Sequence, residues 1–161
     1  MEHDSAHQKN WQIFEVIVGI PFLAAIGLQL VWPIAFPFQR LKLMMILLGC
    51  VLVFAGLLLV TIARREFARQ AQPTDPGFST SRIIKTGVFS YSRNPLYLGG
   101  ILFLLGINLG FRITWGVILL IPALVACRIM LVGPEEKYLA TKFGEDYLMY
   151  KARVHRWIGR K

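Results

Sequence analysis

From Leu41 to Ala63 the chain reads LKLMMILLGCVLVFAGLLLVTIA, and this run decides the fold class. Its one charged residue is Lys42, and the run ends at Arg64 and Arg65. A helix needs about 20 consecutive apolar residues to cross the roughly 30 Å of hydrocarbon in a bilayer. The run therefore predicts a membrane-spanning helix.

Three further apolar runs lie before and after this one, at about residues 13–32, 96–111 and 113–132. The first is bracketed by Trp11 and Trp32, which suit the two membrane interfaces, and Pro21 is expected to kink it. The run at 96–111 is short for a full crossing and joins the last run through a tight hairpin. Together the runs predict a single all-α membrane domain over 1–161, a polytopic protein with about four transmembrane helices.

The formal net charge is +9, and the basic residues sit at the ends of the apolar runs. This placement favours membrane topology over nucleic-acid binding, which uses a polar surface with interleaved aromatic residues. Most Lys and Arg residues near helix ends lie in the loop 64–95 and after Val132. Cytoplasmic loops carry an excess of positive charge, so this loop and both termini are expected to face the cytoplasm. Cys50 and Cys127 lack metal-ligand spacing, and no metal site is expected.

Aromatic and apolar residues recur at helical spacing after Val132, at Leu139, Phe143, Tyr147 and Tyr150. The preceding Gly-Pro-Glu-Glu at 133–136 is typical of a helix start, because proline and acidic residues are favoured in a first turn. The pattern predicts a C-terminal amphipathic helix over 134–152 that lies against the membrane or the bundle. The tail beyond it mixes basic and aromatic residues, which suits an anionic lipid surface.

Two segments at the expected cytoplasmic boundary carry chemical groups. The first, GVFSYSRNPLYLGG at 87–100, places Arg93, Asn94 and Tyr97 at the mouth of a helix, and its paired glycines allow a ligand to approach the backbone. The same residues also suit interface anchors, a helix entry and close helix packing. The residues alone leave both interpretations open.

The second segment contains Glu135 and Glu136, followed by FGEDY at 143–147. The two acids either complement a helix dipole, for about 0.3–1 kcal/mol each, or accept hydrogen bonds from the ribose hydroxyls or ammonium group of a ligand. Arg128, about two turns earlier, either extends to the interface or serves a functional site.

The two segments together resemble the isoprenylcysteine carboxyl methyltransferase family. The first is similar to its Arg-His-Pro-x-Tyr-x-Gly signature, and the second to its Glu-Glu followed by Phe-Gly-x-x-Tyr-x-x-Tyr, in the same order over about Ser81 to Val154. The resemblance implies an enzyme that transfers a methyl group from S-adenosylmethionine to a lipophilic acceptor, either a prenylcysteine-like carboxylate or a phospholipid amine. It also implies a cytoplasmic cofactor pocket that the C-terminal helix closes and that the acceptor reaches from the bilayer.

Carried over position by position, the resemblance implies two groups of site residues. The cofactor contacts are Ser81, Arg82, Ile83, Ile84, Phe89, Asn94, Pro95, Leu96, Tyr97, Glu135 and Glu136. Tyr91, Arg93 and Arg128 are the residues expected to position the reacting groups. The sequence departs from the family at Asn94, where the family has His, and at Leu131, where prenylcysteine enzymes carry a substrate-binding Arg.

Two other functions remain open. One is an NADPH-dependent reductase of the sterol-reductase type, whose C-terminal region is broadly similar, although few basic residues are at hand for the phosphates of a dinucleotide. The other is an inactive family member that serves as a membrane scaffold, which predicts no cofactor binding.

Overall fold

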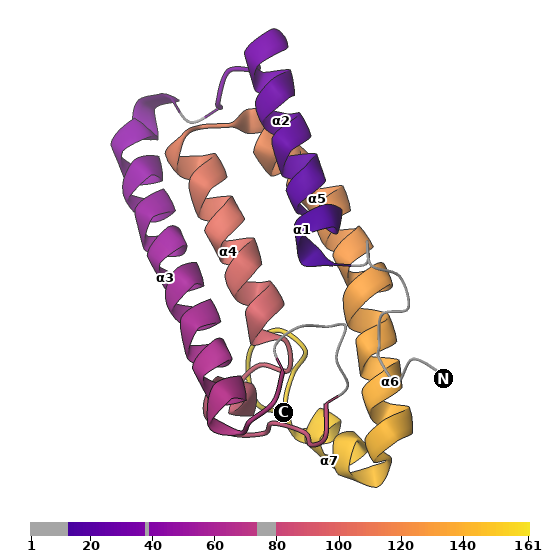
Figure 1. The fold of residues 1–161 in the computed structure, drawn as a ribbon. Helices are drawn as coiled ribbons and strands as arrows, with labels where there is room; N and C mark the ends of the chain where they lie inside the picture. The colour runs from indigo at the N-terminus through magenta and orange to yellow at the C-terminus, as the bar shows by residue number, and fades with distance from the viewer. Residues whose placement is uncertain (1–12, 38, 74–79) are drawn as a thin grey trace.

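The structure is a computed structural model that describes residues 13–37, 39–73 and 80–161, and none of these residues forms a β-strand beyond one isolated bridge. The elements in chain order are α1 (Phe14–Ile17), α2 (Gly19–Val31), η1 (Gln39–Leu41), α3 (Lys42–Arg69), η2 (Gly87–Ser90), α4 (Pro95–Gly110), α5 (Thr114–Cys127), η3 (Arg128–Val132), α6 (Gly133–Phe143) and α7 (Glu145–Arg153). Figure 1 shows α3 beside α4, and α2 beside α5. The predicted all-α fold class is confirmed.

Three helical stretches are long and apolar enough to cross a membrane: Phe14–Val31, Lys42–Arg69 and Thr114–Phe143. The helix Pro95–Gly110 is apolar but shorter, as the sequence predicts. Large apolar side chains point away from the protein along α3, including Leu43, which is 69% exposed, and Phe54, which is also 69% exposed. Apolar surface of this extent is stable against lipid rather than water, and the protein is an integral membrane protein.

Paired glycines bring α3 and α4 into backbone contact. A Cβ atom built on Gly56 would lie 2.5 Å from the carbonyl oxygen of Gly99, and one on Gly49 would lie 2.7 Å from that of Gly106. Small residues allow this approach, which gains dispersion contact between membrane helices. The seven-residue spacing therefore serves packing within the chain, and it fixes α4 against α3.

The first helix breaks at Val18, where α1 ends and α2 begins. Pro21 has no N–H to donate to the carbonyl of Ile17, so the helix cannot continue regularly through this turn. Phe14 packs onto α4, since a Cβ atom built on Gly100 would lie only 2.7 Å from the Phe14 ring. The kink expected at Pro21 is present, one turn earlier along the helix.

The helix α3 ends at Arg69 rather than at Ala63, so the loop is shorter than the expected 64–95. Arg64 and Arg65 are exposed on the last turns, while Ala63 and Glu66 are buried on the opposite face. The two arginines mark an end of the apolar surface, but they do not stop the helix, because Arg is a good helix former.

The structure also differs from the single C-terminal helix expected over 134–152. The helix that begins at Thr114 continues without a stop through the π-helical segment η3 and into α6, and it ends at Phe143. Pro134 cannot donate a backbone hydrogen bond, and the wider π turn absorbs this loss, with the N–H of Gly133 donating to the carbonyl of Arg128. Gly144, at φ +53°, then turns the chain into the separate helix α7.

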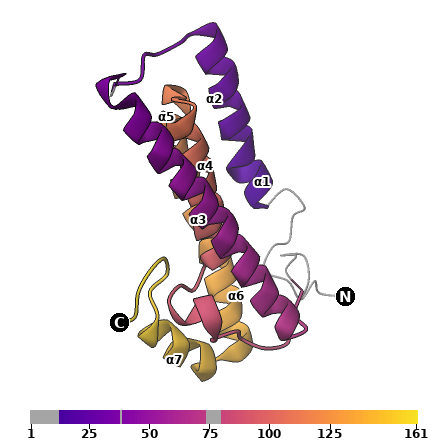
Figure 2. The same cartoon turned by 90° about the vertical axis from the view of Figure 1, so that its left-hand side faces the viewer.

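The helix α7 lies across the end of the bundle, where the end of α3 and the start of α4 also lie (Figures 1 and 2). The two segments that the sequence singles out are therefore brought to the same end of the molecule.

Candidate active site

The turn that leads into the first segment rests on a buried acid of α3. Glu66 is 7% exposed and accepts a hydrogen bond from the hydroxyl of Thr86. Gly87 follows at φ +56°, and a Cβ atom there would lie 2.9 Å from the carboxylate of Glu66. Glycine is favoured here both because φ is positive and because the carboxylate is close. This support fixes η2 and, through it, the start of α4.

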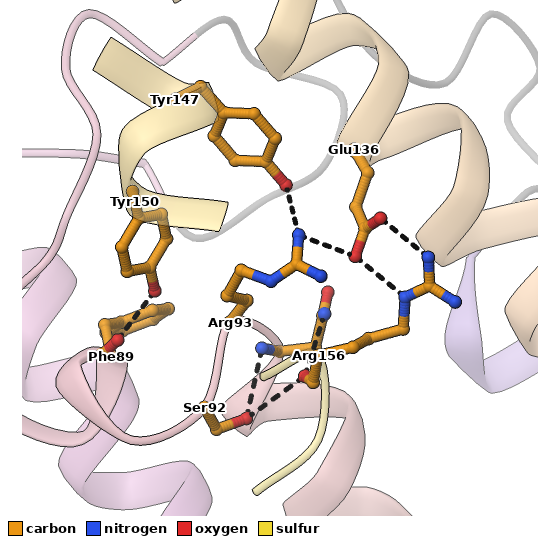
Figure 3. A network of polar contacts seen from close by, with 8 residues as sticks. Phe89, Ser92, Arg93, Glu136, Tyr147, Tyr150 and Arg156 are labelled. Carbon is orange, nitrogen blue, oxygen red and sulfur yellow. Dashed lines mark hydrogen bonds and ion pairs between the residues drawn. The ribbon is translucent and has the colours of Figure 1, made fainter. Parts of the chain in front are cut away.

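Glu136 is the centre of a buried ion cluster (Figure 3). Its carboxylate accepts two hydrogen bonds from Arg156, at 2.8 Å from Nε and 2.7 Å from Nη2. Nη1 of Arg93 lies 3.1 Å from the same carboxylate and donates to the hydroxyl of Tyr147 at 3.2 Å. The side chains of Arg93 and Glu136 are each 6% exposed, so the ion pair is shielded from solvent. The cluster ties η2 and α4 to α6 and α7.

The C-terminal tail closes over this cluster. The side-chain amide of Asn94 donates to the carbonyl oxygen of Arg156 at 3.1 Å, and the backbone N–H of Arg93 donates to the carbonyl oxygen of His155 at 3.2 Å. Ser92 donates to the same Arg156 carbonyl at 3.5 Å and accepts from the N–H of Asn94 at 3.2 Å. Asn94 therefore orders the tail, through a donor that its neutral amide keeps at every pH.

Two tyrosines of α7 complete the packing. The hydroxyl of Tyr150 donates to the carbonyl oxygen of Phe89 at 2.6 Å, and the rings of Tyr147 and Tyr150 meet edge to face at 6.2 Å between centroids. Burial and the nearby Glu136 carboxylate raise the pKa of Tyr147 to about 12. Tyr147 is therefore a neutral phenol at physiological pH. It accepts a hydrogen bond from Arg93 and adds no second negative charge beside the Arg93–Glu136 ion pair.

Glu135 points to a different side of α6 and meets Tyr97 of α4. The Tyr97 hydroxyl and the Glu135 carboxyl interact through a hydrogen bond. The second carboxyl oxygen of Glu135, Oε2, is buried and has no hydrogen-bond partner among the described residues. Tyr97 packs against Phe14 and the core around Cys127. A buried acidic oxygen beside a phenol is thus available inside the bundle, between α4 and α6.

The part of the chain that matches known proteins includes this end of the molecule and the helices that lead to it. Residues 44–146 match the family model described as phospholipid methyltransferase. The chain belongs to the phospholipid methyltransferase family. It is 32% identical over 111 residues to Protein-S-isoprenylcysteine O-methyltransferase from Saccharomyces cerevisiae; the match covers 66% of this chain and 46% of the yeast protein. No solved structure matches the chain.

The matched region of the phospholipid methyltransferase family includes both pairs that join α6 to the segment around the start of α4. Tyr97 with Glu135, and Arg93 with Glu136, all lie within residues 44–146, whereas Arg156 lies beyond them. The ion cluster therefore combines residues within the family match with a residue of the tail.

The four residues expected before the motif, 81–84, have different surroundings. Ser81 is exposed and exchanges hydrogen bonds of 2.8 Å with the side chain of Gln72, and Arg82 is exposed. Ile84 is buried against Ala63 of α3, while Ile83 packs on the tyrosine cluster of α7. The structure does not bring these four side chains together on one surface.

The remaining expected contacts line the start of α4. Phe89 and Pro95 are buried, and Leu96 packs beside Phe89 in the apolar cluster that faces α3. Tyr91 is 59% exposed, and its ring stacks under Arg160 at 5.0 Å. Arg128 is exposed at the start of η3, and the structure does not bring it into the ion cluster.

Two residues of this end were not identified from the sequence. Arg156 was interpreted as part of a lipid-facing tail, but it is the main partner of Glu136. Glu66 is one helical turn beyond the apolar run and carried no motif. The one available signal was that two adjacent acids at 135–136 face different sides of a helix, so at least one needs a cation from outside the motifs.

Proposed function

We propose that this protein is an S-adenosylmethionine-dependent methyltransferase that acts on a lipophilic acceptor, either a prenylcysteine-like carboxylate or a phospholipid amine. Family membership and the similarity to the yeast O-methyltransferase support the reaction class. The apolar, membrane-spanning helices support an acceptor that is delivered from the bilayer.

The observation that carries the proposal is the unpartnered Oε2 of Glu135 beside Tyr97. A buried acceptor that lacks a hydrogen bond costs about 1–3 kcal/mol, and a donor group from a ligand would remove this cost at Glu135. The hydroxyls of a ribose or the ammonium group of an amino acid are donors of the required kind. S-adenosylmethionine carries both, which supports the proposal of this cofactor.

Glu136 has a supporting role in this proposal. Two arginines already use its carboxylate, so Glu135 is the acid that remains for the cofactor. Arg93 is likewise a positioning residue, because its guanidinium is held by Glu136 and Tyr147. The other proposed cofactor contacts are those implied by the family motif: Ser81, Arg82, Ile83, Ile84, Phe89, Asn94, Pro95 and Leu96. Tyr91 and Arg128 are proposed on the acceptor side.

The cofactor supplies a methyl group that its sulfonium makes electrophilic. The chain's own residues then have to align the acceptor and exclude water, and this needs no covalent nucleophile. A carboxylate acceptor attacks directly, and one C–O bond forms as the C–S bond breaks. An amine acceptor first gives up a proton, either to a carboxylate of the Glu135–Glu136 pair or to water. We place this chemistry on the cytoplasmic side, to which the positive loop is assigned.

A methyl-transfer assay in proteoliposomes tests the proposal. S-adenosylmethionine with a tritiated methyl group is supplied with N-acetyl-S-farnesylcysteine or with phosphatidylethanolamine. Label is expected in one of the two acceptors, and Glu135→Gln is expected to remove at least about 90% of it, while Glu145→Gln on the exposed face of α7 keeps it. Label in neither acceptor, or equal rates for both variants, would overturn the proposal.

A further inference from the structure

A cavity opens at the same end of the molecule, and Tyr150 is one of the residues that line it. Its volume is about 480 Å³, and it lies between the η2 turn, α7 and the tail. Its lining residues are Lys85, Ser90, Met149, Tyr150, Arg153, Val154, Arg160 and Lys161. Four of these are basic and none is acidic. Neither Tyr97 nor Glu135 lines it, so it is distinct from the candidate active site.

The tail holds the basic groups of this cavity in place. Val154 and Arg160 form a backbone bridge, and the N–H of Gly159 donates to the carbonyl oxygen of Tyr91 at 2.7 Å. The guanidinium of Arg160 lies 5.0 Å from the centre of the Tyr91 ring and donates to the carbonyl oxygen of Ser90 at 3.4 Å. The position of this cation is therefore preorganised rather than left to a free side chain.

The positive charge of the cavity is poorly neutralised by the protein. Lys85 pairs with Asp146, whose carboxylate lies 3.4 Å away and is exposed. Within the described part of the chain, neither Arg153 nor Arg160 forms an ion pair. Like charges brought together repel, so an arrangement of this kind favours an anionic ligand.

Exposed apolar side chains lie close in sequence to the basic residues that line the cavity. Leu148 and Met149 of α7 are 54% and 48% exposed, and Ile158 of the tail is 71% exposed. These side chains lie next to the basic residues in the chain, at the end of a membrane-spanning bundle. A free phosphate would use only the charges, whereas a lipid would use the cations for its headgroup and the apolar side chains for its acyl chains.

We propose that the cavity formed by Lys85, Arg153 and Arg160 with the tail binds the phosphate headgroup of an anionic membrane phospholipid. The bound lipid anchors α7 and the tail at the membrane surface. It is a docking ligand and not the methyl acceptor, because an anionic headgroup such as phosphoglycerol carries no amine for the reaction.

Native mass spectrometry of the full chain in detergent tests this proposal, with phosphatidylglycerol or phosphatidylcholine added. The protein is expected to retain one phosphatidylglycerol with at least about tenfold preference over phosphatidylcholine. Arg153→Gln with Arg160→Gln removes the preference, and the charge-keeping Arg153→Lys with Arg160→Lys retains most of it. The matched control is Arg64→Gln with Arg65→Gln, which removes the same charge from exposed positions of α3 outside the cavity and keeps the preference.

Three results would overturn the proposal. The first is no preference for phosphatidylglycerol in the unmodified protein. The second is an equal loss in the cavity variant and in the α3 control, which would indicate a general surface charge effect. The third is displacement of the lipid by millimolar inorganic phosphate, which would assign the cavity to a free anion.

Discussion

Arg156 donates two hydrogen bonds, of 2.8 and 2.7 Å, to the carboxylate of Glu136, and so joins the chain's tail to the helix that carries Glu135. Since Glu135 and Glu136 are adjacent on α6, any rotation of this helix that loosens the ion pair also moves Glu135 relative to Tyr97. The tail therefore helps to hold the position of α6, which carries Glu135.

Replacing Arg156 is expected to weaken both the fold and the site. Arg156→Ala leaves the buried Glu136 with Arg93 as its remaining cation, and we expect a loss of about 1–3 kcal/mol in the free energy of unfolding. Arg156→Lys keeps the charge but not the paired hydrogen bonds, so its free energy of unfolding is expected to lie between those of Arg156→Ala and the unmodified protein. Thermal unfolding in detergent measures this, and Arg64→Ala is the exposed control. Unchanged stability in Arg156→Ala would show that the ion pair does not hold the tail.

The backbone contact between α3 and α4 leads to a second prediction. Gly56→Ala places a methyl group 2.5 Å from the carbonyl oxygen of Gly99, which forces the helices apart and is expected to cost about 1–3 kcal/mol. Gly27→Ala is the matched control, because a Cβ atom at that position meets nothing within 4 Å. Comparison of the two melting temperatures checks the expectation. Equal stability of the variants would contradict the close packing of α3 on α4.

The link between α7 and η2 leads to a third prediction. Tyr150→Phe removes the hydrogen bond to Phe89 and leaves that carbonyl oxygen without this partner, at an expected cost of about 1–2 kcal/mol. Because Phe89 is one of the proposed cofactor contacts, we also expect the variant to bind S-adenosylhomocysteine more weakly. Calorimetry on the variant and the unmodified protein compares the two affinities. A variant with lower stability but unchanged affinity would show that α7 does not affect cofactor binding at the site.

Much of the fold follows from local properties of the sequence. The apolar runs predict their helices because length and hydropathy alone decide what crosses a bilayer. The extra turns of α3 beyond Ala63 do not follow, because arginine marks a membrane boundary without opposing a helix. The division at Gly144 depends on a single positive φ in a stretch whose helical spacing continues on both sides. The passage of the helix through Pro134 depends on the π turn that precedes it.

The candidate site, too, could be predicted from the sequence only in part. Tyr97 and Glu135 stand in short motifs and could be named from the sequence, and the structure brings them together across α4 and α6. Arg156 could not be named, because a basic residue in a basic tail looks the same whether it faces lipid or a buried acid. The difference arises from the turn at Gly144 and the path of α7, which direct the tail back over Asn94.

The most direct test of the account is calorimetric titration of the detergent-solubilised protein with S-adenosylhomocysteine, run in parallel with NADPH. We expect binding of S-adenosylhomocysteine at micromolar concentration and none of NADPH, with a loss of at least about tenfold in affinity for Glu135→Gln and no change for Glu145→Gln. Folded protein that binds neither compound, or that prefers NADPH, would contradict the assignment of the Tyr97–Glu135 pair to a methyl-donor site.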